Sequence, residues 1–499
     1  MTQLRARIAA ALCAAVVLSC GGAGDDAGSE AQYVPRDRTL VMDCAETNTC
    51  AGQILDYNSF NPYLPGATSR TGYNWLYEPL YFYLAYRDED NIVPWIATGH
   101  EYNDTYTEVT IHIRPGVEWS DGHPWTAHDL VFTINMLRDN APTLTFSTDM
   151  ETWVEDAVAI DDLTAVIKLS APNPRFVFSY FTANFGNGIP IVPRHIWEGV
   201  DAETFANYDP SRGWPVVTGP YRMVISVPAQ RIYDLRDDWW AAKIGFQRLP
   251  RVERLVYLPF QDEVKRVQNL IGNHIDTSLD LRPPNIMTAV ERNENVTTWS
   301  GRQTPYGRRD WWPISLGFNN TEAPFNDPEI RWAINHAIDR QALVDVAWQG
   351  AGETTLLPFP RFPPLLKYLS QMEDLLEKYP VGLHDPSRTG RIMQSKGWAK
   401  DAEGFWSKDG ERFKILIDVF DFHQDLAPIL TAQLNRAGFD ANFRKTPDGL
   451  TRMMQGTARS FIMGHGGSVR DPYFTMRLYH SRFVEPTGTP TPMFWRWSN

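Results

Sequence analysis

Residues 108–137 read "EVTIHIRPGVEWSDGHPWTAHDLVFTINML", and they decide the fold class because a strand, a turn and a helix follow one another within them. The first six residues alternate polar and apolar side chains, which predicts a half-buried strand. Ser-Asp-Gly at 120–122 is typical of a turn. Thr126, with Asp129 three positions later, has the capping-box pattern of a helix start, and apolar residues at helical spacing follow. The stretch therefore predicts a mixed α/β protein.

The same stretch brings two acids and two histidines, Asp121, His123, His128 and Asp129, into nine positions. The turn accounts for Asp121 and the helix cap for Asp129. The two histidines are five positions apart, so they do not share a helix face, and the pattern His-Glu-x-x-His is absent from the sequence. We interpret the cluster as structural and expect no metal site.

The rest of the chain also mixes strands and helices in irregular alternation. Apolar residues at every second position predict strands, and apolar residues three and four apart predict helices. These patterns predict strands at 251–260 and 413–420 and helices at 262–276, 328–348 and 426–439. The helix at 262–276 carries Val264, Val267, Leu270 and Ile271 on one face and is stopped by Gly272. The helix at 328–348 keeps its apolar residues on one side, and these are Ile330, Ala333, Ile334, Ala337 and Ile338. The helix at 426–439 is ended by Gly438. No repeat period is visible, so a solenoid or propeller is not supported.

Length and composition indicate a large globular protein. The chain has 499 residues, a formal charge of -13, 43% hydrophobic residues and 13% aromatic residues. A single core rarely grows this large, so two or three lobes are expected. The acidic balance and the lack of a Lys/Arg cluster in the sequence argue against a nucleic-acid partner.

The first 38 residues predict export. Residues 1–19 have the charged start, short apolar run and small residues of a signal peptide. Cys20 resembles the acylated cysteine of a bacterial lipobox; the alternative is a plain signal peptide in which Cys20 has no role. Residues 20–38 are then expected to be a lipid-anchored flexible tether, because the Gly, Ala, Asp and Ser that fill its first half cannot bury a core.

Cys44 and Cys50 remain once the signal peptide and the anchor are set aside. Five residues lie between them, and in an exported chain this spacing predicts a small disulfide loop. The alternative is a pair of reduced core cysteines.

Several long stretches together resemble the family 5 extracellular solute-binding proteins, the peptide/nickel-type receptors of ABC importers. They occur in that family's order, and they are "RPGVEWSDGHPWTAHDLVFTIN" (114–135), "IPIVPRHIW" (189–197), "TGPYRMVISVPAQRIYDLRDDWW" (218–240) and "LGFNNTEAPFNDPEIRWAINHAIDRQALV" (316–344). The resemblance implies a two-lobe α/β fold of the periplasmic-binding-protein type (type II) with an extra third domain. The implied domains are lobe I at 39–73 and 186–302, an inserted domain at 74–185 packed on lobe I, and lobe II at 303–499. Family members usually continue for roughly a hundred residues more, so lobe II is expected to be incomplete and the C-terminus truncated.

The resemblance also implies a function and partners. The chain is expected to capture an oligopeptide or oligosaccharide between the lobes by hinge closure and to deliver it to an ABC permease with its ATPase. We expect a monomer, attached to the membrane by lipid at the periplasmic or outer face of the cytoplasmic membrane, with no cofactor and no enzymatic activity.

One departure from the family concerns the ligand. Peptide receptors of the family carry an aspartate four residues before the proline of an Asp/Glu-Pro pair, where it pairs with the peptide's amino group. Here Asp471-Pro472 forms the pair, and Ser468 stands at the position of that aspartate. A hydroxyl cannot neutralise a buried ammonium, which favours an uncharged ligand, such as an oligosaccharide, slightly over a peptide.

Aromatic residues supply the candidate ligand contacts. "YGRRDWWP" (306–313) precedes the strand of "ISLGFNN", so Trp311 and Trp312 are predicted as stacking platforms. The alternative is an aromatic loop packed at a domain junction. The predicted polar contacts are Arg308, Arg309, Asp310, Asn319, Ser468 and Asp471, and Trp75 is a further candidate. By contrast, the tryptophans of family-like motifs are expected in the core, and these are Trp119, Trp239, Trp240 and Trp398.

Two rival functions remain open. "HGGS" (465–468) is superficially similar to the oxyanion loop of esterases, but the sequence has no G-x-S-x-G elbow, and 60 acidic residues leave a glycosidase pair possible by composition. The chain could therefore be a secreted hydrolase. It could also be a lipoprotein that binds a ligand for sensing rather than for transport.

Overall fold

The computed structural model of the chain describes residues 33–44, 50–64, 67, 72–183, 188–279, 281–307, 312–419, 423–446, 448–464, 467–491 and 493–496. The predicted signal peptide and Cys20 lie outside these residues. None of the helices in the described ranges combines the length and the apolar character that crossing a membrane requires.

Lobe I is built on a four-stranded sheet with the order β1-β11-β10-β9. Its strands are β1 (Thr39–Asp43), β9 (Tyr221–Val227), β10 (Gln230–Leu235) and β11 (Arg254–Leu258). The first strand of the chain pairs in parallel with β11, while β9, β10 and β11 form an antiparallel meander. Helices α9 (Glu263–Ile271) and α10 (Pro283–Arg292) pack on this sheet through Val41 and Leu258. Because β1 pairs with β11, the part of the chain between these two strands, which includes the inserted domain, begins and ends at the lobe I sheet.

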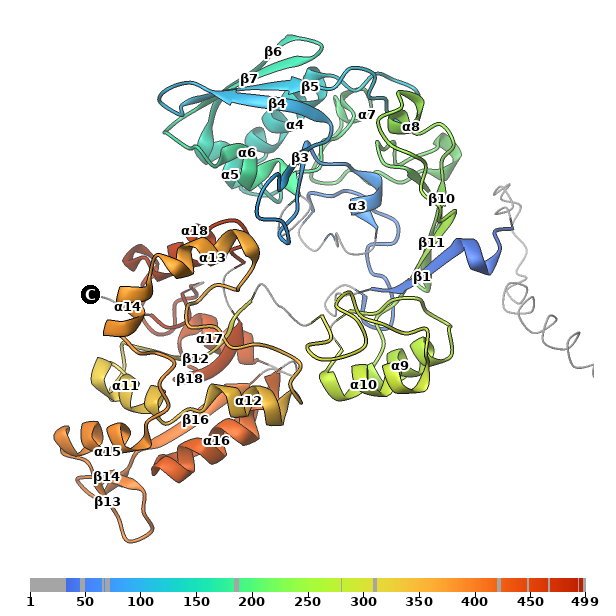
Figure 1. Ribbon diagram of the computed structural model, residues 1–499. Helices are drawn as coiled ribbons and strands as arrows, with labels where there is room; N and C mark the ends of the chain where they lie inside the picture. The colour runs from blue at the N-terminus through green and yellow to red at the C-terminus, as the bar shows by residue number, and fades with distance from the viewer. Residues whose placement is uncertain are drawn as a thin grey trace, which may run out of the picture.

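The inserted domain occupies the top of Figure 1. Its main sheet has the order β4-β5-β7-β6, and a small sheet has the order β3-β2-β8. The strands are β2 (Tyr81–Tyr83), β3 (Ile92–Pro94), β4 (Ala97–Tyr102), β5 (Glu108–Ile113), β6 (Val154–Asp161), β7 (Thr164–Leu169) and β8 (Thr182–Ala183). The helices of this part and of its junction with lobe I are α3 (Tyr73–Leu76), α4 (Ala127–Asp139), α5 (Ser147–Trp153), α6 (Phe176–Tyr180), α7 (Arg194–Trp197) and α8 (Trp240–Lys243). One buried cluster runs from these sheets into the lobe I sheet, so the two share a core.

The strand–turn–helix prediction for 108–137 is confirmed. Strand β5 buries every second residue, and α4 begins directly after Thr126 with the predicted capping box. The Thr126 amide donates to Asp129 Oδ2 over 2.8 Å, and Asp129 Oδ1 accepts from the Arg194 amide over 2.8 Å. Burial raises the pKa of Asp129 above its ordinary value, although these hydrogen bonds oppose the shift. Asp129 therefore joins the start of α4 to the start of α7.

A buried carboxylate fixes the junction between the inserted domain and lobe I. Glu78 is 5% exposed, and its oxygens accept hydrogen bonds from three indoles: Trp95 Nε1 at 2.9 Å, Trp240 Nε1 at 2.6 Å and Trp239 Nε1 at 3.5 Å. Burial raises the pKa of Glu78 to about 7, against the opposing effect of these donors. Trp119, Trp239 and Trp240 are buried, as the sequence predicted, whereas Trp398 is only partly buried against the core of lobe II.

Lobe II lies at the lower left of Figure 1 and has its own sheet, with the order β12-β18-β16-β17. The strands are β12 (Ile314–Phe318), β16 (Lys414–Val419), β17 (Asp440–Lys445) and β18 (Ser460–Gly464). One face packs against α11 (Pro328–His336) and α16 (Leu426–Ala437), and the other packs against α17 (Gly449–Gln455). The remaining described elements of lobe II are α12 (Arg340–Ala347), α13 (Pro363–Ser370), α14 (Glu373–Lys378), α15 (Pro386–Ser395), α18 (Tyr473–Met476) and a small sheet of β13 (Ala399–Lys400), β14 (Trp406–Lys408) and β15 (Glu411–Arg412).

Two sequence-based expectations for helices need correction. The segment 328–348 forms two helices rather than one, because Asp339 accepts a hydrogen bond from the Ala342 amide and caps a new helix, α12. In α9, Val264 is 64% exposed and does not belong to the buried face. The predicted stops at two glycines are confirmed: Gly272 is the C-cap of α9, and Gly438, with a positive φ of 102°, is the C-cap of α16.

Near the start of lobe I, Cys44 and Cys50 form a disulfide. Both cysteines are fully buried and pack with Ile54. The bridge ties the end of β1 to the segment that follows it.

Candidate functional site

The inserted domain and lobe II touch through a small apolar interface, called here the interlobe cluster. Its buried members are Tyr83 and Phe178 from the inserted domain and Phe359, Phe362, Leu365 and Val469 from lobe II. Tyr83 also donates its hydroxyl to the Val469 carbonyl over 3.2 Å, and its ring meets Phe178 edge-on at 5.2 Å. Burial of these side chains gives the two parts a defined docking position.

Charged side chains border the interlobe cluster. Arg175, at the start of α6, forms an ion pair with Asp471 of lobe II. The Arg175 guanidinium lies 4.8 Å from the centre of the Tyr473 ring, and Arg470 lies 4.8 Å from the centre of the Phe178 ring. Both contacts cross the interface: a cation of the inserted domain lies over a ring of lobe II, and a cation of lobe II lies over a ring of the inserted domain.

A second contact joins lobe I to lobe II. Arg282, at the start of α10, donates to Glu263 Oε2 over 2.7 Å and to Asp425 Oδ1 over 3.4 Å. Burial would raise the pKa of Glu263, but hydrogen bonds from Asn285 and Arg282 lower it below the ordinary value. Arg282 therefore links a carboxylate of lobe I to the residue that precedes α16 of lobe II.

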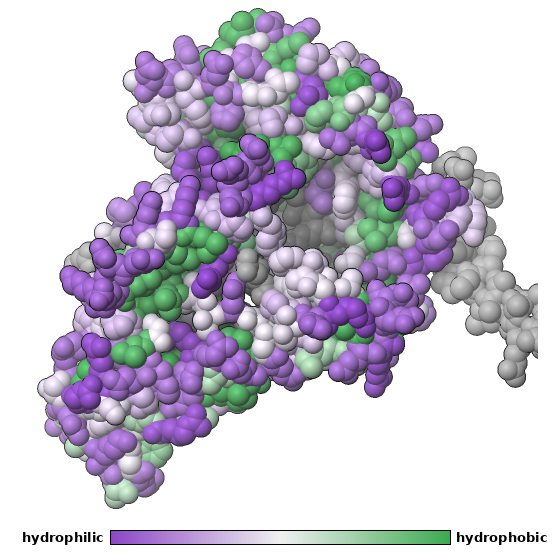
Figure 2. Space-filling view, viewed as in Figure 1, coloured by the Kyte–Doolittle hydropathy of each residue, from purple (hydrophilic) through white to green (hydrophobic). Residues whose placement is uncertain are grey.

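Figure 2 shows that the surface is hollowed between the inserted domain, the α9–α10 side of lobe I and lobe II. The interlobe cluster and the Arg282–Asp425 contact connect the parts that surround this hollow. A solute held there would touch more than one lobe, and such contact is the physical requirement for closure driven by a ligand. We take the hollow as the candidate site.

Lobe II has an additional apolar cavity of about 730 Å³. Its walls come from β12, α11, α12 and the segment 352–361, together with Trp312. The lining residues are all in lobe II, so the approach of lobe I does not complete this cavity. Trp312, which the sequence predicted as an aromatic platform, is 37% exposed and lies in the wall of this cavity.

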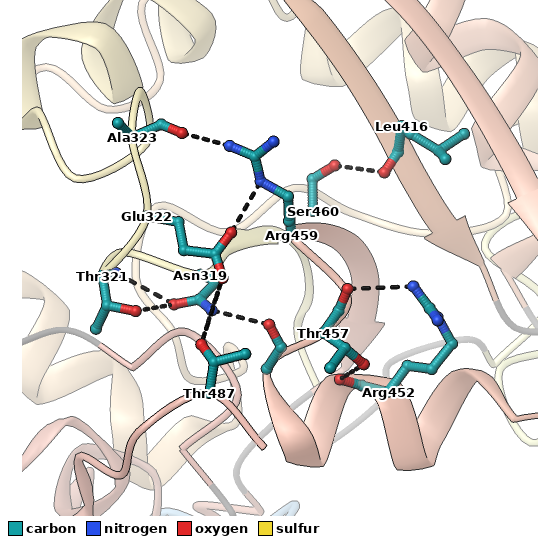
Figure 3. A network of polar contacts seen from close by, with 11 residues as sticks. Asn319, Thr321, Glu322, Ala323, Leu416, Arg452, Thr457, Arg459, Ser460 and Thr487 are labelled. Atoms are coloured by element: carbon teal, nitrogen blue, oxygen red, sulfur yellow. Dashed lines mark hydrogen bonds and ion pairs between the residues drawn. The ribbon is translucent and has the colours of Figure 1, made fainter. Parts of the chain in front are cut away.

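Asn319 lies in a polar network inside lobe II (Figure 3). It is fully buried; its Nδ2 donates to the Gly456 carbonyl over 2.8 Å and to Thr487 Oγ1 over 3.1 Å, and its Oδ1 accepts from Thr321 Oγ1 over 2.7 Å. Its hydrogen-bonding groups are used within the protein. Six residues of nearly extended chain lie between Trp312 and Asn319, which places Asn319 about 20 Å further along the chain.

The other predicted contacts are also distributed over different places. Ser468 is 1% exposed, and its Oγ accepts from the Thr475 amide over 2.9 Å, so it holds the start of α18. Asp471 belongs to the interlobe ion pair. Trp75 is partly buried at the junction of the inserted domain with lobe I, where its Nε1 donates to Tyr257 Oη over 2.7 Å.

The remaining predicted contacts, Arg308, Arg309, Asp310 and Trp311, lie outside the described residues. Sequence reasoning missed Arg175, Tyr83, Phe178, Arg282 and Asp425. These residues carry no local signal, because their partners are distant in the chain: Arg175 and Asp471 are 296 positions apart.

The comparisons with known proteins agree with this architecture. Residues 91–484 match the sequence profile described as bacterial extracellular solute-binding proteins, family 5 Middle. Protein XP55 of Streptomyces lividans is 27% identical over 414 residues, which cover 80% of this chain and 67% of that protein. The oligopeptide-binding protein AppA of Bacillus subtilis is 22% identical over 371 residues, 72% of this chain and 62% of that protein. The chain thus spans about two thirds or less of the length of these relatives.

Solved structures show the same fold. A periplasmic oligopeptide-binding protein of an oligopeptide ABC transporter from Thermotoga maritima superposes with a TM-score of 0.78 at 22% identity, covering 93% of this chain and 83% of that one. A second structure of that protein, bound to mannohexaose, superposes with a TM-score of 0.70 and covers 94% of this chain and 84% of that one. The predicted two-lobe fold is confirmed. Since the profile covers well over half of its residues, the chain belongs to family 5 of the bacterial extracellular solute-binding proteins.

Proposed function

We propose that this chain is the solute-binding component of an ABC importer, which captures an oligopeptide or an oligosaccharide in the hollow between the lobes and delivers it to a permease and its ATPase. The observation that carries the proposal is the hollow itself, with its surrounding parts connected by the interlobe cluster and by Arg282. Family membership and the names of the relatives support the transport role.

The local chemistry favours an uncharged ligand. Ser468 replaces the carboxylate that anchors a peptide amino group in related receptors, and its hydroxyl is engaged with the Thr475 amide. Asp471, the nearest carboxylate in the sequence, is paired with Arg175. A free ammonium would therefore need another partner to offset the cost of its burial. The mannohexaose found on the Thermotoga neighbour supports a test with oligosaccharides of similar size.

We propose that the protein captures its solute without changing it chemically. We also propose that it is exported, acylated at Cys20 and monomeric. The proposed solute contacts near the passage into lobe II are Trp311, Trp312, Arg309 and Asp310. The extracellular character of the family supports export. Mass spectrometry of the membrane-bound and released protein would test the lipid at Cys20.

A paired ligand screen tests the function. The purified chain, beginning at Gly21, is heated in the presence of a series of mannose oligomers and of matched peptides with free or acetylated amino ends. A ligand at about 100 times its Kd stabilises the native state by about 2.7 kcal/mol, which raises the melting temperature measurably. We expect oligosaccharides or acetylated peptides to give larger shifts than free peptides.

Two further readouts complete the screen. Small-angle scattering should show a more compact particle with the stabilising ligand, and mass spectrometry should recover that ligand unchanged. Hydrolysis products would instead support the hydrolase alternative, and the absence of any shift across both series would contradict capture of these solutes.

A further inference from the structure

Three side chains with metal-binding donor atoms meet where the inserted domain joins lobe I. Asp121 and His123 come from the turn before α4, and His195 comes from α7. Asp121 Oδ2 lies 2.6 Å from His195 Nε2 and 3.2 Å from His123 Nδ1. All three donor atoms lie within 4.8 Å of one another. The sequence pattern showed only the first two members, because His195 is 74 positions from Asp121.

The backbone holds both segments in place. The Trp119 amide donates to the His123 carbonyl over 2.8 Å, and the Gly122 amide donates back to the Trp119 carbonyl over 3.0 Å, which fixes the turn. On the other side, Asp129 receives the Arg194 amide and so fixes the start of α7. The backbone therefore holds the three residues close together, while their exposed side chains can still rotate.

The arrangement of the rings favours a shared cation. His123 and His195 stack with their centres 4.0 Å apart, and one nitrogen of each approaches the same carboxylate oxygen. The other carboxylate oxygen, Oδ1, accepts the His123 amide over 3.2 Å, an outer contact of the kind that orients a metal ligand.

We propose that Asp121, His123 and His195 form a binding site for a divalent transition-metal cation such as Zn²⁺. Two imidazole nitrogens and one carboxylate oxygen are a donor set that suits Zn²⁺, Ni²⁺ or Cu²⁺ and that suits Mg²⁺ poorly. Rotation of exposed side chains brings the donors to the separation of about 2.0–2.2 Å from the ion that zinc requires, and water completes the coordination.

The bound cation would tie the inserted domain to lobe I. The site lies beside α7, at the top of Figure 1 and away from lobe II. None of its three residues belongs to the interlobe cluster or to the Arg282–Asp425 contact. A metal that binds the native state but not the unfolded chain raises the melting temperature of the part that contains it.

Calorimetric titration with ZnCl₂ tests the site on chain purified without a polyhistidine tag. We expect one ion per chain, with MgCl₂ giving no binding. His195→Gln and His123→Gln should each weaken Zn²⁺ binding by at least about tenfold. The matched control is His128→Gln, because His128 is a nearby exposed histidine that faces Asp162 at 3.6 Å instead of the cluster.

A second variant and a spectroscopic measurement guard against misfolding. Asp121→Asn keeps an oxygen for the turn but removes the charge, so it should fold normally and bind Zn²⁺ more weakly. Electron paramagnetic resonance of bound Cu²⁺ should show two ring nitrogens in the natural chain and one in the folded His195→Gln chain. Unchanged affinity in His195→Gln, equal loss in His128→Gln, or no saturable Zn²⁺ binding by the natural chain would overturn the proposal.

Discussion

Replacing Glu78 by Gln should change the pH dependence of stability, because Glu78 is a buried acid with a pKa of about 7. A raised pKa means that the folded protein binds this proton more tightly than the unfolded chain does, whose ordinary value is 4.5. Folding is therefore favoured by Glu78 at low pH, and stability declines as pH rises from 4.5 towards 7. Above about pH 7 the carboxyl is ionised in both states and the decline ends.

The magnitude follows from the size of the pKa difference. At about 1.36 kcal/mol for each pKa unit, the rise from 4.5 to about 7 corresponds to about 3 kcal/mol, most of which falls between pH 5 and pH 8. Gln cannot ionise, so Glu78→Gln lacks this decline. It also places an amide donor against the Trp240 or Trp95 indole, and that cost is the same at every pH.

Urea unfolding followed by tryptophan fluorescence measures the effect at several pH values on the natural chain and on Glu78→Gln. The two free energies of unfolding are subtracted at each pH, so contributions from all other titrating groups cancel. We expect the difference to shift by about 2–3 kcal/mol in favour of the variant between pH 5 and pH 8. A difference that stays constant over this range would refute the reasoning, whatever its absolute size.

Two further predictions concern the interlobe ion pair and the lobe II network. Asp471→Asn leaves Arg175 without its carboxylate at a partly buried contact, which should weaken the docking of lobe II on the inserted domain by about 1.5–3 kcal/mol and solute affinity by at least about tenfold. The charge swap Arg175→Asp with Asp471→Arg should recover part of the loss, and equal affinity in all variants would contradict a role of this ion pair in solute binding. Asn319→Ala leaves the buried Gly456 carbonyl without its donor and should lower the free energy of unfolding of lobe II by about 1–3 kcal/mol in urea titration, whereas an unchanged urea midpoint would show that the network adds no stability.

Local patterns predicted the fold well because they reflect local physics. Strand β5 and helix α16 were evident from apolar spacing, and their ends from capping or turn residues. The break before α12 was missed because the apolar spacing continues through it, while the cap at Asp339 acts on the backbone of the next turn. Periodicity alone does not distinguish one long helix from two short ones on the same face.

The site was less predictable, since it depends on contacts between distant segments. Asp471 was expected to face a ligand, yet its partner Arg175 comes from another domain. Asn319 follows a strand near the passage between the lobes, but its amide donates to Gly456 and Thr487. These partners are far away in the sequence, so no local pattern predicts them. Family resemblance supplied the two-lobe arrangement and the position of the hollow, which periodicity alone could not give.

The pairing of β1 with β11 has a consequence for biosynthesis. Thr39 pairs with Arg254, so the first strand has no partner until more than two hundred further residues have left the ribosome or the export channel. At about 5–20 residues per second, this delay is about 10–40 s. During that time the emerging chain carries an unpaired apolar strand edge. Chaperones that shield such edges would therefore be needed most before residue 254 emerges. Lobe II, whose sheet is drawn from one continuous later stretch, can assemble afterwards without waiting for any earlier segment.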